Sequence, residues 1–341
     1  MRKIIFPHPE PPRLKARIRP LFLPFSGCPH RCVFCSQTAQ TGEGINPLET
    51  IYAKFKDNLE QDLKRKARPY EIAFFGGTFT ALPGDWSERF VDLAASYRNE
   101  GLTTRIRCST RPDALWPEKL DRLKSLGLNM VELGVQSFDP AALAESGRGY
   151  DPRTAIKGCR MVLKSGLTLG VQLMPGMPGS TPKSFLRDAD LTSGLGPRIV
   201  RLYPCLALKG TRLAEIWSKG GFTPWGMEKT LLYLSMAVGV FWRKGIRTAR
   251  IGLAPERAMI EDILAGPWSP DLGTRVRARA LFGRIKLLAS GVGREPEKLM
   301  VPRRYSGEIF GRKKELAPSY ERMGLGPGRI KFWDNPVFMM R

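Results

Sequence analysis

Histidine is nearly absent from this sequence. Among 341 residues, only His8 and His30 carry an imidazole. A zinc-binding His-Glu-x-x-His helix therefore cannot form, and neither histidine stands in a context that suits a Ser-His-Asp triad. An enzyme built from this chain needs another source of reactivity, and a redox or radical cofactor would provide one.

Long hydrophobic runs are missing as well. The longest, Leu231–Trp242, has 12 residues, whereas a helix that crosses a bilayer needs about 20. Near the N-terminus, Pro7, Pro9, Pro11 and Pro12 interrupt the segment where a signal peptide would have its apolar core. We therefore expect a cytoplasmic protein without membrane contact.

Acidic residues are scarce relative to basic ones. The chain has 55 Lys and Arg against 32 Asp and Glu, a net charge of +23, and residues 271–341 hold 16 basic and 7 acidic side chains. Such a field attracts polyanions, with nucleic acid as the first candidate partner. A basic proteome or an adaptation for solubility would give the same composition, and no recognition motif decides between these explanations.

Short apolar runs alternate with helical patterns through most of the chain. We expect strands at residues 18–25, 71–76, 103–108, 129–136, 167–174, 198–204 and 248–253. We expect helices at residues 47–66, 85–100, 117–126, 152–165, 182–193 and 227–244. This alternation predicts an α/β fold with a parallel sheet, a partial (βα)6-type TIM barrel whose active residues lie at the C-terminal ends of the strands.

The alternation of predicted strands and helices is absent at both ends of the chain. Residues 1–17 are rich in proline and basic side chains, which predicts an irregular N-terminal arm. Residues 18–253 form the predicted barrel. Residues 254–341 are rich in Gly, Pro and Arg, and we expect them to form a small basic C-terminal lobe.

Three of the six cysteines cluster in one short segment, at Cys28, Cys32 and Cys35. Six cysteines are too few to staple a chain of this length, and clustered cysteines in a reducing compartment indicate metal binding or catalysis. A structural zinc would want a fourth protein ligand, and the remaining cysteines are far apart in sequence. An iron–sulfur cluster with one open iron fits three cysteines better.

The segment "CPHRCVFC" resembles the CxxxCxxC signature of the radical S-adenosylmethionine (SAM) superfamily, with Phe34 just before the last cysteine. The resemblance implies a [4Fe–4S] cluster on Cys28, Cys32 and Cys35, with SAM chelating the fourth iron. It further implies reductive cleavage of SAM to a 5′-deoxyadenosyl radical, and an electron donor of the flavodoxin or ferredoxin type.

Other motifs extend the resemblance over about residues 18–275. In order, "FFGGTFTALP", "STRPDAL", "VELGVQSFD", "GVQLMPGMPG" and "RLYPCLALKGT" are similar to bacterial radical SAM proteins related to the Elongator catalytic subunit and to anaerobic coproporphyrinogen dehydrogenases. In such barrels a glycine pair holds the SAM amino group, glutamines hold the ribose, and an arginine meets the carboxylate. The residues that match these and neighbouring positions, and that the resemblance implies as SAM contacts, are Phe34, Gly76, Gly77, Thr78, Ser109, Gln136, Arg148, Gln172 and Tyr203.

The chain also departs from this pattern. The Elongator subunit carries an acetyltransferase domain, and no Gly-rich acyl-CoA loop is evident here, so we expect the radical SAM part alone and do not carry over the wobble-uridine reaction. Cys108 and Cys205 fall near the catalytic ends of predicted strands. A thiol there could donate hydrogen or form a thiyl radical, while a buried cysteine acting as a small hydrophobe is the commoner arrangement.

Three functions stay open from the sequence. The first is a radical SAM enzyme that acts on RNA, with a tRNA-like substrate. The second is a radical SAM enzyme that acts on an anionic small molecule such as a tetrapyrrole. The third is a non-catalytic cluster protein or a zinc-stabilised adaptor.

Overall fold

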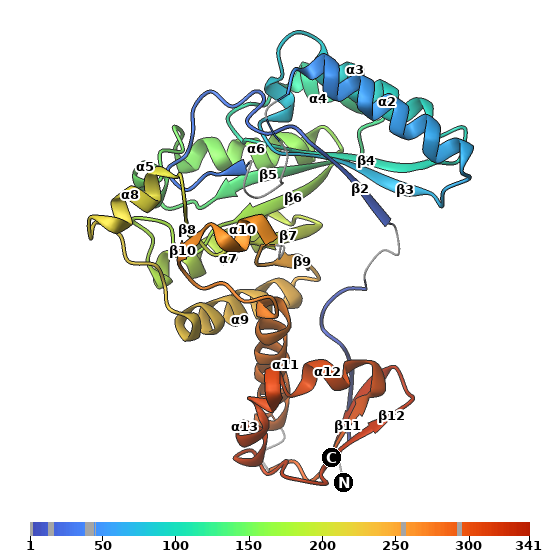
Figure 1. Ribbon diagram of the computed structural model, residues 1–341. Coiled ribbons are helices and arrows are strands. Elements are labelled where there is room, and N and C mark those ends of the chain that lie inside the picture. The colour runs from blue at the N-terminus through green and yellow to red at the C-terminus, as the bar shows by residue number, and fades with distance from the viewer. Residues whose placement is uncertain (1–2, 13–16, 38–43, 45, 254–256, 292–294) are drawn as a thin grey trace.

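All seven predicted strands are present and form one parallel sheet. The computed structural model describes residues 3–12, 17–37, 44, 46–253, 257–291 and 295–341, and its strands pair in the order β2-β3-β4-β5-β6-β7-β9. Their bounds are Arg17–Phe22 (β2), Tyr70–Phe75 (β3), Thr103–Thr110 (β4), Met130–Gln136 (β5), Thr168–Leu173 (β6), Ile199–Leu202 (β7) and Arg247–Ile251 (β9). The sheet curls into an open half-barrel (Figure 1), which confirms the predicted partial barrel.

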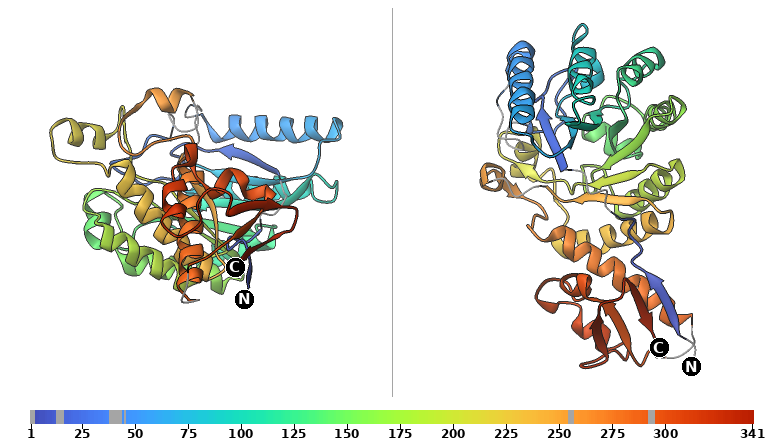
Figure 2. Two further views of the ribbon diagram at one scale, coloured as in Figure 1. Left: turned by 90° about the horizontal axis from the view of Figure 1, so that it is seen from below. Right: turned by 90° about the vertical axis from the view of Figure 1, so that its right-hand side faces the viewer.

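Six helices connect these strands and cover the outer face of the sheet (Figures 1 and 2). They are Leu48–Lys64 (α2), Trp86–Ser96 (α3), Pro117–Ser125 (α4), Pro152–Lys164 (α6), Pro182–Leu195 (α7) and Met227–Arg243 (α9). Local sequence sets several starts: Asp151 caps α6 and Thr181 caps α7, each followed by a proline at the first helical position. No helix of the described residues is long and apolar enough to cross a membrane.

The core lies between the sheet and these helices. Alternate strand residues such as Ile72, Phe74 and Ile106 are completely buried on the outer face. Phe74 stacks on Phe79 with 4.7 Å between the ring centroids and packs against Phe90 of α3 at 5.8 Å. Burying apolar side chains of this size gives the sheet its main stabilisation.

Shorter elements lie at the C-terminal ends of the strands. They are the 3-10 turn Phe79–Ala81 (η1), the helices Pro140–Glu145 (α5), Arg212–Ser218 (α8) and Arg257–Glu261 (α10), and an antiparallel ribbon of Ala207–Leu208 (β8) and Ile263–Ala265 (β10). The sequence pattern did not predict these pieces, because each is too short to show a period.

The C-terminal segment builds a lobe of its own beside the half-barrel (Figure 1). The long helix Leu272–Ser290 (α11) packs against α9 and leads into a four-stranded sheet of order β1-β13-β11-β12. The remaining pieces are Leu299–Pro302 (β11), Arg303–Tyr305 (η2), Ser306–Ile309 (α12), Arg312–Lys314 (η3), Ala317–Glu321 (α13), Ile330–Trp333 (β12) and Val337–Met340 (β13). The boundaries predicted for the barrel and the lobe stay a prediction.

The expectation of an irregular N-terminal arm is wrong for its first part. Ile4–Pro7 form strand β1, which pairs antiparallel with β13, so both termini lie in the lobe (Figures 1 and 2). Phe6 stacks on Phe338 at 5.2 Å, and Nε2 of His8 lies 3.1 Å from the carboxylate of Glu308. The pairing partner is more than 300 residues away in sequence, and a four-residue strand carries no period of its own.

Candidate functional site

A cavity of about 560 Å³ opens at the C-terminal ends of the parallel strands. All three clustered cysteines line it. So do eight of the nine residues predicted to contact SAM, namely Phe34, Gly76, Gly77, Ser109, Gln136, Arg148, Gln172 and Tyr203. They come from six strands or the loops that follow them, so the fold gathers residues spread over about 175 positions of sequence into one pocket.

Thr78 is the exception. Its side chain is fully buried, and its hydroxyl lies 3.3 Å from the sulfur of Cys28. Its backbone N–H donates to the carbonyl of Ser26 at 2.7 Å. Thr78 therefore stands behind the cysteine loop, and does not line the cavity.

Gly76 and Gly77 let the cysteine loop approach the end of β3. Both have left-handed φ angles, and a Cβ on Gly77 would lie 2.1 Å from the carbonyl oxygen of Ser26. The contact is reciprocal, because a Cβ on Gly27 would lie 2.4 Å from the carbonyl oxygen of Thr78. The glycines are thus required by backbone-to-backbone packing, a reason that the sequence pattern alone did not give.

Gln37 was not predicted and links the same two segments. Its Oε1 accepts hydrogen bonds from the backbone N–H of Phe25 at 2.6 Å and of Gly77 at 2.8 Å. Its Nε2 lies 3.6 Å from the sulfur of Cys35. A lone glutamine two residues after a cysteine motif has no sequence signal of its own, so only the structure identifies it.

Each clustered thiol has a hydrogen-bonding partner. The sulfur of Cys28 contacts the hydroxyl of Thr78, and the sulfur of Cys35 accepts a hydrogen bond from the side-chain amide of Gln37. The sulfur of Cys32 accepts a hydrogen bond from Nη1 of Arg148 at 3.0 Å. The Arg111 guanidinium stands 3.9 Å from the same sulfur. Donors and positive charge around sulfur stabilise the thiolate form, which is the form that binds metal.

Arg148 is the most informative of these partners. It is 5% exposed, and its partners among the described residues are Cys32, the carbonyl of Gly134 and the hydroxyl of Tyr150, none of which is a carboxylate. Arg111 holds it in place by donating to its backbone carbonyl. A buried guanidinium without a counter-ion calls for an anion, and a thiolate-bound cluster or a ligand carboxylate would supply one.

The donor set suits a cluster better than a single ion. No group of three His, Cys, Asp or Glu in the described part of the chain could hold one metal ion, as the ligands of a zinc must when they converge to about 2.3 Å from a common point. The sulfurs of a cluster bind separate irons and need no common point. Burial, with Cys32 nearby, raises the pKa of the Cys35 thiol to about 12, so loading a metal there must displace its proton.

Gln136 and Gln172, on the neighbouring strands β5 and β6, contact each other in the pocket. Nε2 of Gln172 on β6 donates to Oε1 of Gln136 on β5 at 3.3 Å. Their remaining amide groups can serve the two hydroxyls of a ribose. Tyr203, predicted to approach adenine, accepts a hydrogen bond from Nη1 of Arg201 at 3.0 Å.

Next to these residues the inner face of the barrel carries ion-paired charges. Glu132 stands between Arg107, at 3.2 Å, and Arg201, at 2.5 Å, and Glu71 lies 3.5 Å from Arg107. Glu132 pairs in register with Ser109 and Arg201 with Gln172, so these two lie beside predicted SAM contacts, whereas Arg107 lies two residues, or about 7 Å, deeper than Ser109. The two arginines and two glutamates are neutral as a group.

The other cysteines do not line this pocket. Cys108 faces the helices within the main core, and Cys205 lies in a smaller apolar cluster that also contains Cys32 and Phe34 of the cysteine loop. Both are essentially buried, and burial raises both pKa values, that of Cys205 to about 12. The structure therefore favours the small-hydrophobe interpretation for both, and Cys159 is likewise fully buried in the core.

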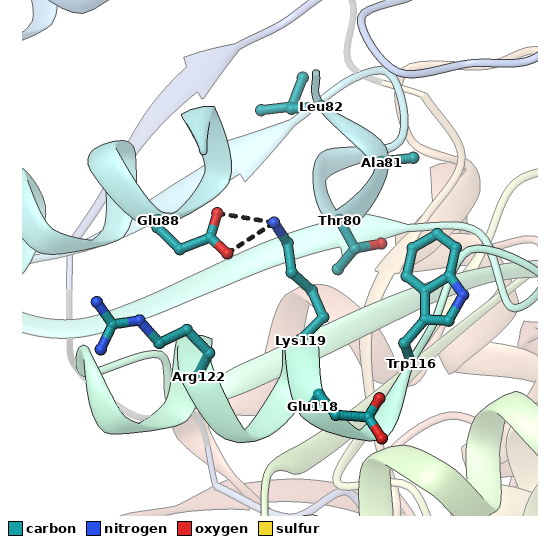
Figure 3. A pocket seen from close by; sticks show the side chains of 8 residues that line it. All are labelled: Thr80, Ala81, Leu82, Glu88, Trp116, Glu118, Lys119 and Arg122. Carbon is teal, nitrogen blue, oxygen red and sulfur yellow. Dashed lines mark hydrogen bonds and ion pairs between the residues drawn. The ribbon is translucent and has the colours of Figure 1, made fainter. Parts of the chain in front are cut away.

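A second cavity of about 640 Å³ lies outside the barrel (Figure 3). Lys119 reaches from α4 to both carboxylate oxygens of Glu88 on α3, each at 2.7 Å, and Trp116 stands at its edge. No cysteine lines it. It is open to the surface, and Lys119 and Glu88 already pair with each other there, so it is not the candidate site.

Comparison with known proteins agrees with the motifs. Residues 22–192 match the family model described as the radical SAM superfamily, and residues 197–280 match that of the radical SAM C-terminal domain. A tRNA uridine(34) acetyltransferase of Methanocaldococcus infernus is 30% identical over 264 residues, which cover 66% of this chain and 49% of that protein. Elongator complex protein 3 of Danio rerio is 23% identical over 240 residues, or 57% of this chain and 44% of that protein.

Among solved structures, the archaeal Methanocaldococcus infernus Elp3 has the same fold, with a TM-score of 0.58 and 23% identity over 82% of this chain and 64% of that one. The chain spans about half the length of the first curated relatives it matches. These relatives confirm the resemblance to the Elongator catalytic subunit. The chain belongs to the radical SAM superfamily, and is an enzyme with the cofactors of that family, a [4Fe–4S] cluster and SAM.

Proposed function

We propose that this enzyme cleaves SAM reductively at a [4Fe–4S] cluster held by Cys28, Cys32 and Cys35, and that its substrate is RNA. When bound, the cluster supplies one electron to SAM, which yields methionine and a 5′-deoxyadenosyl radical that takes hydrogen from the substrate. The convergence of the three thiols with Arg148 in one pocket carries the first half of the proposal.

The chain's own residues orient SAM. Gln136 and Gln172 offer their amides to the ribose hydroxyls, and Arg148 offers its positive charge and the remaining N–H of Nη1 to the carboxylate. The same guanidinium donates to Cys32, so it ties the ligand and the cluster loop together. Phe34, which is 7% exposed, and its apolar neighbours exclude water beneath the loop.

The distribution of charge in the pocket supports the second part of the proposal, that the substrate is RNA. The ion-paired arginines and glutamates of the inner face are neutral as a group, and Nη2 of Arg107 is buried among them without a hydrogen-bond partner in the described residues. It can donate to a neutral acceptor such as a base carbonyl. At the rim, Arg31 and Arg250 line the pocket, are exposed and have no ion pair within the described part of the chain. A nucleotide places its neutral base inside and its phosphate outside, which matches this order.

The relatives point the same way, because several are named for tRNA uridine(34). Their names describe proteins about twice as long as the matched part, so the specific reaction is not transferred. The substrate class is what we infer, an RNA whose target nucleotide enters the barrel.

Anaerobic reconstitution tests both halves together. Protein loaded with iron and sulfide receives SAM, dithionite in place of a flavodoxin or ferredoxin donor, and total cellular RNA. We expect 5′-deoxyadenosine by chromatography, more of it with RNA than without, and a nucleoside of changed mass in the digested RNA. Absence of 5′-deoxyadenosine would leave the non-catalytic alternative standing.

RNA binding itself can be tested at the rim. The double variant Arg31→Gln with Arg250→Gln removes two exposed charges from the pocket. If both contact phosphates of a single strand, the slope of log affinity against log salt should become shallower by about 1.4. The control Arg160→Gln with Arg198→Gln removes two exposed charges elsewhere, and should leave the slope unchanged.

An anionic small molecule such as a tetrapyrrole is the second candidate. The arginines at the rim favour it, because they would also bind carboxylates. In the same assay a carboxylated tetrapyrrole, and not RNA, would then increase 5′-deoxyadenosine formation.

A further inference from the structure

Gln136 occupies an unusual backbone conformation at the end of β5. Its φ is +67°, and the N–H of Ser137 donates to the carbonyl of Val135 at 2.9 Å, which closes a γ-turn of the rarer, strained kind. Five described non-glycine residues have positive φ, and Gln136 is the buried one. Such a conformation is strained and persists only where neighbouring groups enforce it.

The carboxylate of Asp188, on helix α7, enforces the conformation of this turn. Asp188 of α7 is 4% exposed and accepts hydrogen bonds from the hydroxyl of Ser137 at 2.5 Å and from the N–H of Phe138 at 2.9 Å. The hydroxyl of Ser137 in turn accepts from the N–H of Asp139 at 2.9 Å. Asp188 thus holds the first two residues after Gln136 directly, and Ser137 holds the third.

The fixed segment continues to the next pocket residue. Asp139 caps α5 by accepting from the N–H of Ala142 at 3.1 Å. After α5 the N–H of Arg148 donates to the carbonyl of Leu143 at 3.0 Å. The stretch between Gln136 and Arg148 is therefore one connected unit, and both of its ends line the pocket.

Stability alone does not explain a carboxylate at this position. Burial raises the pKa of Asp188 to about 7; the negative charge of Asp139 raises it further, while Arg187 and the two hydrogen bonds oppose the rise. No ion pair holds Asp188 within the described residues. A buried carboxylate without a cation is a costly way to anchor a loop that neutral side chains could anchor.

We propose that Asp188 is a positioning residue for SAM, which holds the γ-turn that directs Gln136 into the pocket. The inference rests on the proposed contact between Gln136 and SAM. Asp188 does not line the cavity, so it acts through Ser137 and Phe138 and touches no ligand itself.

The test measures SAM binding without turnover. Reconstituted holoenzyme is dialysed to equilibrium against SAM in the absence of reductant, and the melting temperature of each variant is recorded alongside. We expect the dissociation constant to rise about tenfold for Gln136→Ala and similarly for Asp188→Ala, which corresponds to about 1.4 kcal/mol. Asp188→Asn keeps an acceptor and should stay within about threefold, while Asp190→Ala, an exposed aspartate of the same helix, should bind like wild type.

A double variant separates positioning from general damage. If Asp188 acts through Gln136, the dissociation constant of Gln136→Ala with Asp188→Ala should match that of Gln136→Ala within about twofold. Independent effects that multiply to about a hundredfold would overturn the inference. So would wild-type affinity in Asp188→Ala beside a weakened Gln136→Ala.

Two further outcomes are decisive. Wild-type affinity in Gln136→Ala would overturn the proposed SAM contact, and with it this inference. If Asp188→Ala does not fold, Ser137→Ala takes its place, since it removes one of the two bonds and should weaken SAM binding about threefold with little change in melting temperature. Unchanged SAM binding in Ser137→Ala beside weakened binding in Gln136→Ala would then overturn the inference.

Discussion

The two faces of the parallel sheet are built from different chemistry. On the outer face, side chains such as Ile72 and Phe74 are completely buried among the helices. On the inner face, Arg107 and Glu132 are about equally buried, at 5% and 4% exposure, yet they are charged and ion-paired. Apolar residues of similar volume would often be at least as stable there. The outer face therefore sets stability, and the inner face retains polar groups for a ligand.

Cysteine shows the same contrast within one residue type. Cys108 points into the apolar core, whereas Cys32 points toward Arg148 and Arg111. Both are buried, at 0% and 8% exposure, so burial does not separate a structural cysteine from a ligand. The partners around the sulfur do. Four substitutions test this division between the faces.

The largest effect is expected at the cysteine loop. Cys32→Ala should lose the cluster entirely, measured as iron and sulfide content and visible absorbance after reconstitution, because two thiols cannot replace the third. His30→Ala is the matched control, since His30 is an exposed residue of the same loop and should retain the cluster. The reverse result, a cluster lost in His30→Ala and kept in Cys32→Ala, would refute the assignment.

The outer face should respond in stability alone. Phe74→Ala removes a fully buried ring stacked on Phe79 and should lower the free energy of unfolding by about 3–5 kcal/mol, measured by urea titration. The folded fraction should bind SAM as wild type does. A tenfold loss of affinity there would show that the two faces are not separate.

At Asp188 we expect a smaller effect on the free energy of unfolding, one that depends on pH. Its carboxyl has a pKa near 7 in the folded protein and an ordinary value of 3.8, so the folded state binds the proton more tightly and stability is lost as pH rises through that window. Asp188→Asn removes the titration. Relative to wild type, its unfolding free energy should therefore increase by roughly 1–3 kcal/mol between pH 5 and 8. Asp190→Asn should show no such trend, and a flat difference for Asp188→Asn would contradict the shifted pKa.

The smallest effect is expected in the cavity outside the barrel. Glu88→Gln weakens the contact with Lys119 and should cost about 0.2–1 kcal/mol at pH 7. Lys119 and the neighbouring donors lower the pKa of Glu88 despite its partial burial, so this contribution is present at neutral pH and is lost as pH falls. SAM binding should not change, and a change would mean that this cavity communicates with the pocket.

Much of the fold was predictable because its signals are local. Each strand of the barrel is a short apolar run followed by a turn, and the helices show a helical period, with a capping side chain at the start of α6 and of α7. The N-terminal strand was missed because its partner, β13, lies at the other end of the chain. Thr78 stays a predicted SAM contact, but its burial behind the cysteine loop came only from the structure, because a motif identifies a position and cannot show which way a side chain turns.

The sequence by itself determined the chemistry, through the spacing of Cys28, Cys32 and Cys35 and the rhythm of strands that places this loop at the barrel's catalytic end. Tertiary structure decided which side chains support that chemistry. Gln37 joins the glycine turn 40 residues away, Arg148 reaches Cys32 across 116 residues, and Asp188 holds Ser137 across 51. Contacts over such separations follow from how the elements pack, and a buried polar group finds its partner only once that packing is complete.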